Sequence, residues 1–338
     1  MQTFGKLHQT WVKTLAAVSA VAAIGLYSGA AVAQNWPSKP VRLVVCFPPG
    51  NAADVIARTL GPSLAQRLGQ PVVVENRGGA GGIIGVDAVA KSPADGYTLG
   101  MCSLSPFTII PSVRRKMPYN PTKDIAPILL ATKGPMVVLV KKDSPIDSLE
   151  KLVQLTKADP QKYTYASLGP GTISQMSTEA FKAASGAALT EITYKGSSQA
   201  LMDLIGGHVD VMIDGVVSAA AQMSAGTVKA LGVTTAKRSS IMPDVMTLSE
   251  SNVPGLKNFD VFGWVGLFAP AGVPAPIATR VHNEVADILR DPEVVKRINA
   301  AGQDVAEPTS PTQFKEFMQK DLERWTGLAR KLKIEIAD

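Results

Sequence analysis

Two short loops carry the residues of this chain that are best suited to bind a ligand. The first, Phe47 to Asn51, follows an apolar run and reads Phe-Pro-Pro-Gly-Asn; the second, Ser167 to Ser174, is rich in Ser, Thr and Gly. Each lies between a predicted strand and a predicted helix, so the first backbone N–H groups of the helix point at whatever binds there. Such N–H groups and hydroxyls bind anions, which makes a carboxylate the expected guest.

Two ordinary strand-to-helix turns would show the same pattern. We favour ligand binding because both loops avoid bulk and charge and come from opposite halves of the chain. A third segment, Ser103 to Pro106, ends a strand at the same edge of the predicted sheet. The expected ligand-binding residues are Phe47, Pro49, Gly50, Asn51, Ala52, Ser103, Ser167, Gly169, Thr172, Ile173 and Ser174.

Residues that could activate a nucleophile or hold a metal ion are scarce. Beyond residue 33 the chain has two histidines, His208 and His282, and neither stands in an H-E-x-x-H or paired Cys/His pattern. No G-x-S-x-G motif is present. We therefore expect no catalytic residues, no metal ion and no organic cofactor; the alternative is an exported hydrolase that uses Ser167 or Ser197.

A glycine cluster at Gly78 to Gly82 is similar to a dinucleotide-binding fingerprint. However, G-x-G-x-x-G begun at Gly79 needs a glycine where Ile84 stands, and no P-loop lysine follows. The cluster is better interpreted as a loop whose backbone passes close to a ligand or to a facing loop.

The first 33 residues have the pattern of a secretory signal peptide. Lys6 and Lys13 precede the apolar stretch from Leu15 to Leu26, and Ala31-Val32-Ala33 provides a cleavage site. A membrane anchor is the alternative, but the apolar run is short for a span. Removing the segment leaves 32 basic and 28 acidic residues, a net charge of +4. That mild excess, without basic clusters, argues against nucleic acid as a partner.

The rest of the chain is ordinary globular material, long enough for two domains. Hydrophobic residues make up 46% of the 338 residues and charged residues 18%. Predicted strands and helices alternate. The composition changes near Lys133-Gly134-Pro135, and a predicted strand from Val228 to Thr234 returns the chain, so that a second crossing is expected at about Thr234 to Lys237. We therefore expect a discontinuous first domain, residues 34–132 and 236–338, a second domain, residues 133–235, with a strand from Met136 to Val140, and a hinge at the two crossings.

Several stretches resemble the substrate-binding receptors of tripartite tricarboxylate transporters, the TctC or Bug family. They are Val41–Arg58, Glu75–Gly82, Asp95–Leu99 and Tyr194–Gly196, and the resemblance extends over essentially the whole chain after residue 33. It implies an α/β fold, a two-lobed periplasmic binding protein of the type II-like class. Each lobe would be an open, mostly parallel sheet flanked by helices.

The resemblance also implies a function. A member of this family would be a periplasmic monomer in a Gram-negative bacterium that captures a small carboxylate and delivers it to membrane transporter subunits. Its ligand would be a di- or tricarboxylate, an aromatic carboxylate or an acidic amino acid, and a role as a ligand sensor is the alternative. The family pattern points to the same two loops and adds Asp214, which could meet the ammonium group of an amino acid.

Three residues depart from the family pattern and bear on the identity of the ligand. Cys46, Asn51 and Gln175 stand where the family usually has proline, glycine and histidine. Cys46 and Cys102 both lie near the ends of predicted strands in an exported chain, so they could form a disulfide. We favour two buried thiols, because neighbouring parallel strands rarely give good bridge geometry.

Overall fold

The computed structural model describes residues 36–334. The predicted signal peptide, residues 1–33, lies outside the described residues. From Lys39 on, the chain forms one folded unit. Within the described range, no helix combines the length and the apolar character that crossing a membrane requires.

Helices and strands alternate along most of this unit. The helices are α3 (Ala52–Leu68), α4 (Ile83–Ala90), α5 (Ile110–Val113), α6 (Leu149–Ala158), α7 (Ile173–Ser185), α8 (Ser197–Gly206), α9 (Val216–Ser224), α10 (Ala275–Ile288), α11 (Pro292–Ala300) and α12 (Pro311–Leu332). The strands are β1 (Val41–Val45), β2 (Val72–Asn76), β3 (Thr98–Ser103), β4 (Ile125–Lys141), β5 (Thr164–Ser167), β6 (Thr190–Thr193), β7 (Val211–Gly215), β8 (Val228–Val233), β9 (Phe262–Pro270) and β10 (Asp304–Val305).

The strands form one continuous sheet in the order β2-β1-β3-β9-β4-β7-β5-β6, with β8 and β10 also paired to β4. β1 is parallel to β2 and β3, and β5 is parallel to β6 and β7. β9 and β4 run antiparallel to their neighbours. The parallel strands of each half therefore end at sheet edges where ligand loops can form.

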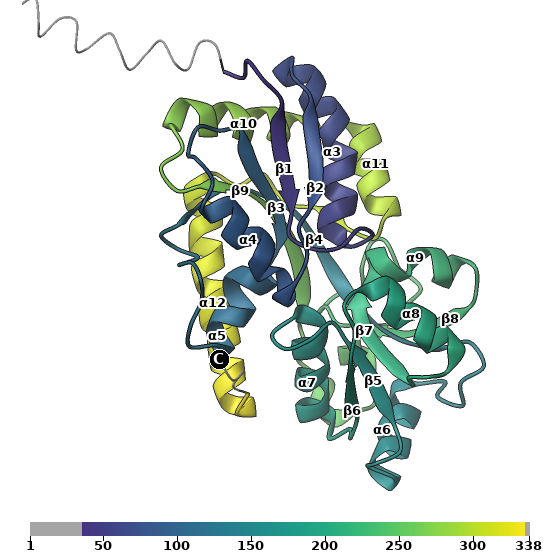
Figure 1. Cartoon of the computed structure of the whole chain (residues 1–338). Coiled ribbons are helices and arrows are strands. Elements are labelled where there is room, and N and C mark those ends of the chain that lie inside the picture. Colours follow the sequence, from purple (N-terminus) through teal and green to yellow (C-terminus); the bar gives the residue numbers. More distant parts are fainter. Residues whose placement is uncertain (1–35, 335–338) are drawn as a thin grey trace, which may run out of the picture. The chain divides into compact units, whose positions relative to one another are not determined.

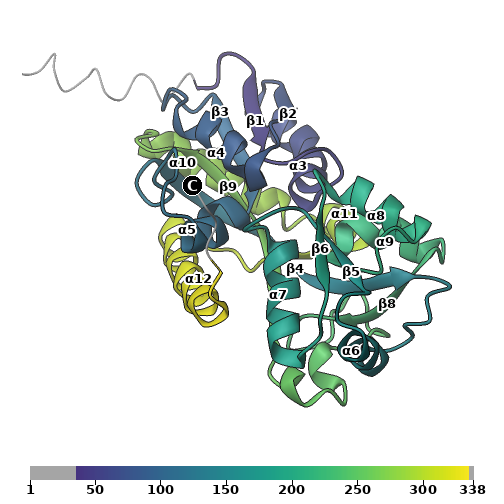
Figure 2. The ribbon, with the colours of Figure 1, turned by 60° about the horizontal axis from the view of Figure 1, so that its bottom comes forward.

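Two lobes share β4, as the expected fold class requires. Lobe 1 contains β1, β2, β3 and β9 with α3, α4 and α10 to α12, and lobe 2 contains β5 to β8 with α6 to α9 (Figure 1). Figure 2 shows β4 running from one lobe into the other. The architecture is mixed α/β, with helices flanking the sheet. The domain boundaries at residues 132/133 and 235/236 stay a prediction.

The strand expected to start at Met136 is longer than predicted. β4 is continuous from Ile125 to Lys141 and runs through Gly134-Pro135, where we expected a break. Its first part pairs with β9 and its second part with β7 and β8. Pairing on both halves keeps this segment extended, although glycine and proline disfavour strands.

Aromatic residues form the core of lobe 1 behind the sheet. The rings of Phe107 and Phe268 stack with centroids 4.1 Å apart, and Trp264 meets Phe314 of α12 edge-on at 5.6 Å. The buried carboxylate of Asp321 accepts hydrogen bonds from Trp264 Nε1 (2.9 Å) and from the Thr108 hydroxyl (2.8 Å). The helix α12 buries one apolar face, and Asp321 fixes the tryptophan against it.

The two cysteines form a disulfide, so the expectation of free thiols was wrong. Cys46 and Cys102 directly follow the paired residues Val45 and Met101 of β1 and β3, and their Cα atoms are 5.3 Å apart. This register places the two side chains opposite one another at the ends of the strands. The bridge therefore ties together the segments that begin the two ligand-facing loops of lobe 1.

Removing this bridge should destabilise the protein. The disulfide closes a loop with a sequence separation of 56 residues, and losing such a constraint on the unfolded chain costs about 2–4 kcal/mol. We expect urea denaturation of Cys46→Ser/Cys102→Ser to show this decrease in the free energy of unfolding. Reductant should lower the wild-type midpoint to the same value and leave the variant unchanged. A wild-type midpoint that does not respond to reductant would contradict the assignment.

Candidate functional site

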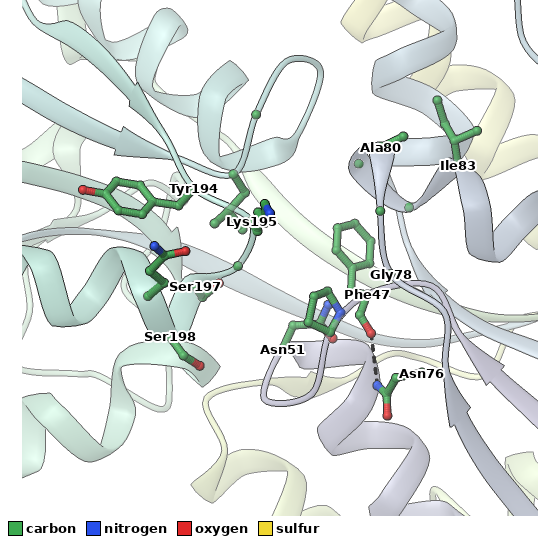
Figure 3. Close-up of a pocket in the computed structure, with 18 of the residues that line it drawn as sticks. Phe47, Asn51, Asn76, Gly78, Ala80, Ile83, Tyr194, Lys195, Ser197 and Ser198 are labelled. Atoms are coloured by element: carbon green, nitrogen blue, oxygen red, sulfur yellow. Dashed lines mark hydrogen bonds between the residues drawn. The ribbon is translucent and has the colours of Figure 1, made fainter.

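A large cavity opens at the carboxyl ends of the parallel strands, between the two lobes. This outer cavity has a volume of about 960 Å³. In Figure 3, Phe47, Gly78, Ala80 and Ile83 lie on one side of it, and Tyr194, Lys195, Ser197 and Ser198 lie on the other. Its walls are loops from both lobes, as expected for a cleft that binds ligands.

A smaller cavity lies deeper, where the loops of the two lobes approach each other. This inner cavity has a volume of about 70 Å³ and shares Phe47, Asn51, Leu168 and Ser197 with the outer one. Its other walls include Ala52, Ala53, Ser103, Ser105, Thr172, Ile173, Asp214, Ser218, Trp264 and Gln303.

The first loop is held in place by its own side chains. Asn51 Oδ1 accepts the N–H of Asp54 (3.0 Å), which caps α3, and Asp54 Oδ2 accepts the N–H of Gly50 (3.0 Å). Asn76 Nδ2 donates to Phe47 O (3.0 Å; Figure 3) and to Asp54 Oδ1 (2.9 Å). Asp54 thus stabilises the start of its own helix.

These bonds decide which N–H groups at the start of α3 are free. The Gly50 and Asp54 N–H groups are already occupied. Among the described residues, the N–H groups of Ala52 and Ala53 have no acceptor, and both residues line the inner cavity. The anion-binding capacity of this helix start therefore lies at Ala52 and Ala53.

Gly50, one of the residues expected to bind the ligand, is placed differently from its neighbours in the loop. It is exposed, and it is not among the residues that line either cavity. Its φ of +88° favours glycine, and a Cβ on it would lie 3.6 Å from Ser198 Oγ of lobe 2. Gly50 is a point where the two lobes come close together.

The second loop is fixed by a polar network beneath it. Thr172 caps α7, and Gln175 Oε1 accepts the N–H of Gly171 (2.8 Å). The Gln175 amide then donates to Glu191 (3.1 Å), which also accepts the hydroxyl of Ser167. Glu191 and Gln175 therefore hold the loop in shape from below.

One hydrogen bond joins the loops of the two lobes directly. The N–H of Ile173, the first residue of α7, donates to Ser105 Oγ of lobe 1 (3.1 Å). Both residues line the inner cavity. The Ser105 hydroxyl of lobe 1 thus accepts the hydrogen bond from the first N–H group of α7 in lobe 2.

The start of a third helix also faces the cleft. α8 begins at Ser197, and its cap residue Gly196 makes no side-chain bond to the helix. Within the described range, the N–H groups of Ser197, Ser198 and Gln199 have no acceptor, and all three residues line the outer cavity. Three helices, α3, α7 and α8, therefore begin at this cleft.

The comparisons with known proteins agree with this geometry. The family model of the tripartite tricarboxylate transporter family receptor matches residues 56–334. The chain belongs to this family. Protein BugT of Bordetella pertussis (strain Tohama I) is 36% identical over 299 residues, which cover 88% of this chain and 90% of BugT.

Solved structures with similar folds include two in which a ligand is bound. Rpa4515 of R. palustris with adipate has a TM-score of 0.85 and 31% identity, and the match covers 89% of this receptor and 99% of that chain. MatC of Rhodopseudomonas palustris with malate has a TM-score of 0.81 and 31% identity, and the match covers 87% of this receptor and 99% of MatC. The receptor is a periplasmic solute-binding protein of the TctC/Bug family.

Most of the residues that we expected at the site do line the receptor's cavities. The outer cavity contains Phe47, Pro49, Asn51 and Gly169, and the inner cavity contains Phe47, Asn51, Ala52, Ser103, Thr172, Ile173 and Asp214. Ser167 and Ser174 are buried behind the loops instead: Ser167 accepts the Gly169 N–H (3.1 Å), and Ser174 donates to Ile213 O (2.7 Å). Whether the cavity-lining residues contact the ligand stays a prediction.

Sequence reasoning missed other lining residues, among them the start of α8. Tyr194-Lys195-Gly196-Ser197 repeats the pattern of strand, glycine, hydroxyl and helix that identified the other loops, so this signal was present. Asn76 and Arg114 gave no comparable signal, because nothing local links them to the loops. In the part of the chain that the structure describes, no cluster of three His, Cys, Asp or Glu residues could hold a metal ion.

Asp214 dominates the electrostatics of the inner cavity. It is 5% exposed and, among the residues that the structure describes, is the one charged residue in the inner lining. Burial raises the pKa of Asp214, while hydrogen bonds from Ser197, Ser218 and the Gly215 N–H oppose this shift. The Ser218 hydroxyl donates at 2.7 Å. The ionised form is thus held by dipoles and not by a cation.

The stability of the receptor should therefore depend on pH through Asp214. An aspartate in the unfolded chain ionises near pH 4, and the raised pKa means that the folded protein favours the protonated form. The protonated form of Asp214 therefore contributes stability below about pH 4. This contribution is lost as the pH rises through the pKa that Asp214 has in the folded protein. Wild type should lose stability relative to Asp214→Asn as the pH rises above about 4, as thermal melts can show. A difference between the two proteins that does not change with pH would refute this.

Proposed function

We propose that the receptor captures a small carboxylate in the cleft between its lobes and delivers it to a tripartite tricarboxylate-type transporter. The observation that carries the proposal is the convergence of α3 and α8 on the two cavities, because their first N–H groups have no acceptor among the described residues. Such groups bind an anion through charge-assisted hydrogen bonds and the helix dipole.

The neighbours in the comparisons support a carboxylate as the ligand. Malate and adipate, bound to MatC and Rpa4515, are both small dicarboxylates. In this receptor, one carboxylate would lie in the inner cavity at Ala52 and Ala53, where space is limited to about 70 Å³. The remainder of the ligand would extend into the outer cavity.

Asp214 should distinguish between two kinds of small carboxylate, namely amino acids and acids without a cationic group. An amino acid would place its ammonium group near the ionised Asp214, whereas an acid without a cation needs Asp214 to be protonated. The affinity for a simple acid should therefore fall as the pH rises, and the affinity for an amino acid should not. Native mass spectrometry of the purified receptor can identify a molecule that co-purifies with it.

Catalysis by Ser167 or Ser197 is the alternative function. The Ser167 hydroxyl bonds to Glu191 beneath the loop, and neither His208 nor His282 lines a cavity. Among residues 36–334, no hydrogen bond joins either serine to an imidazole that could act as a base. Turnover of carboxylate esters or amides by the purified protein would favour the hydrolase.

Delivery to a transporter and a sensory role predict different cellular phenotypes. Loss of the receptor should abolish uptake of its ligand if it serves a transporter. It should leave uptake intact and alter a transcriptional response if it serves a sensor. We expect the first result.

A proline at position 52 tests the helix-start mechanism directly. Ala52→Pro removes one N–H group, and proline is well tolerated at the first position of a helix. Asn51 already has the extended conformation (φ −89°, ψ 172°) that a residue before proline prefers. Losing one charge-assisted hydrogen bond should cost about 2 kcal/mol, roughly thirtyfold in affinity, in a calorimetric titration with the identified acid.

Ala52→Gly is the matched control, because it changes the same residue and keeps the N–H group. It should bind within a few-fold of wild type, and thermal melts should show that both variants fold. If Ala52→Pro folds and binds as tightly as Ala52→Gly, the carboxylate is not held at the start of α3.

A further inference from the structure

Two cations line the outer cavity from opposite lobes. Arg114 directly follows α5 in lobe 1, and Lys195 lies between β6 and α8 in lobe 2. Figure 3 shows Lys195 on the side of the cavity that faces Phe47 and Ile83. The lining of this cavity, as the described residues define it, contains no aspartate or glutamate. Its charged groups are thus both positive.

Within the described residues neither cation forms an ion pair, in contrast to two arginines near the cleft. Arg58 pairs with Asp54, and Arg77 pairs with Glu75. Arg114 Nε is buried without a hydrogen-bond acceptor, and Lys195 is exposed and has no ion pair within the described residues. A buried donor without an acceptor is costly, and a bound anion would satisfy it.

The surfaces between the two cavities are apolar. Phe47 lies at the junction, and Ile83, Ile110, Leu168 and Pro170 line the outer cavity around it. A ligand that reached from the start of α3 toward the two cations would pass along these side chains. Such surroundings favour a hydrocarbon segment over a polar one.

We propose that Arg114 and Lys195 form a distal subsite that binds the second carboxylate of a linear dicarboxylate whose first carboxylate lies in the inner cavity. This inference rests on the proposed function and extends it. The apolar residues between the cavities contact the hydrocarbon segment of the acid. The receptor then discriminates by charge at the far end of the ligand, and the two cations determine that specificity.

Calorimetric titrations with two series of acids test the subsite. One series contains linear dicarboxylates of increasing chain length, and the other contains the monocarboxylates of equal length. The variants are Arg114→Gln and Lys195→Gln, and Lys296→Gln of α11 is the control that changes net charge equally at an exposed residue away from the cleft. Lys195 lies on an exposed loop, so its variant should fold even if a change at Arg114 disturbs α5.

Wild type should bind its best dicarboxylate at least about tenfold more tightly than the monocarboxylate of the same length. Each subsite variant should lose about tenfold in affinity for the dicarboxylate and change by less than about twofold for the monocarboxylate. The control should match wild type for both.

Two results would overturn the subsite and leave the proposed function intact. Wild type could bind both series equally well, or both subsite variants could retain the preference for dicarboxylates. A folded wild-type receptor that binds no acid of either series would contradict the subsite. It would contradict the proposed function as well only if native mass spectrometry also finds no carboxylate or amino acid bound to the purified receptor.

Discussion

The first N–H groups of an α-helix have no partner within the helix, and this constraint organises the cleft of the receptor. The folded chain leaves such groups at the starts of α3 and α8, where parallel strands of the two lobes end. A third helix, α7, has its first N–H group occupied by Ser105 of the opposite lobe. Glycine, serine and alanine dominate these positions because larger side chains would cover the N–H groups.

Two acidic side chains near the loops, Asp54 and Glu191, support them without lining either cavity. Asp54 holds the first loop through Gly50 and Asn76, and Glu191 holds the second through Ser167 and Gln175. Behind them, the disulfide joins the strands that lead into the lobe 1 loops. Each loop is thus positioned by groups on its far side, which leaves its near side available for an anion.

The sequence predicted the elements whose signals are local. The apolar run before Pro48 and the helical spacing after Asn51 were sufficient for β1, its loop and α3. The pairing between strands that are distant in the sequence could not be predicted. Pairing with β9 keeps β4 extended through Gly134, and the register of β1 against β3 brings Cys46 opposite Cys102. The same limit applies to the site. No local sequence pattern marks Arg114, and only the folding of the chain brings it to the outer cavity. The short helices α9 and α11 were missed because their periodic segments are brief.

The central claim is that helix-start N–H groups hold the ligand's carboxylate in the inner cavity. A crystal structure of the receptor with its tightest-binding acid tests it most directly. The account predicts carboxylate oxygens within hydrogen-bond distance of the Ala52 and Ala53 N–H groups. An acid bound outside the cleft, or held in it by side chains alone with both N–H groups still free, would contradict it.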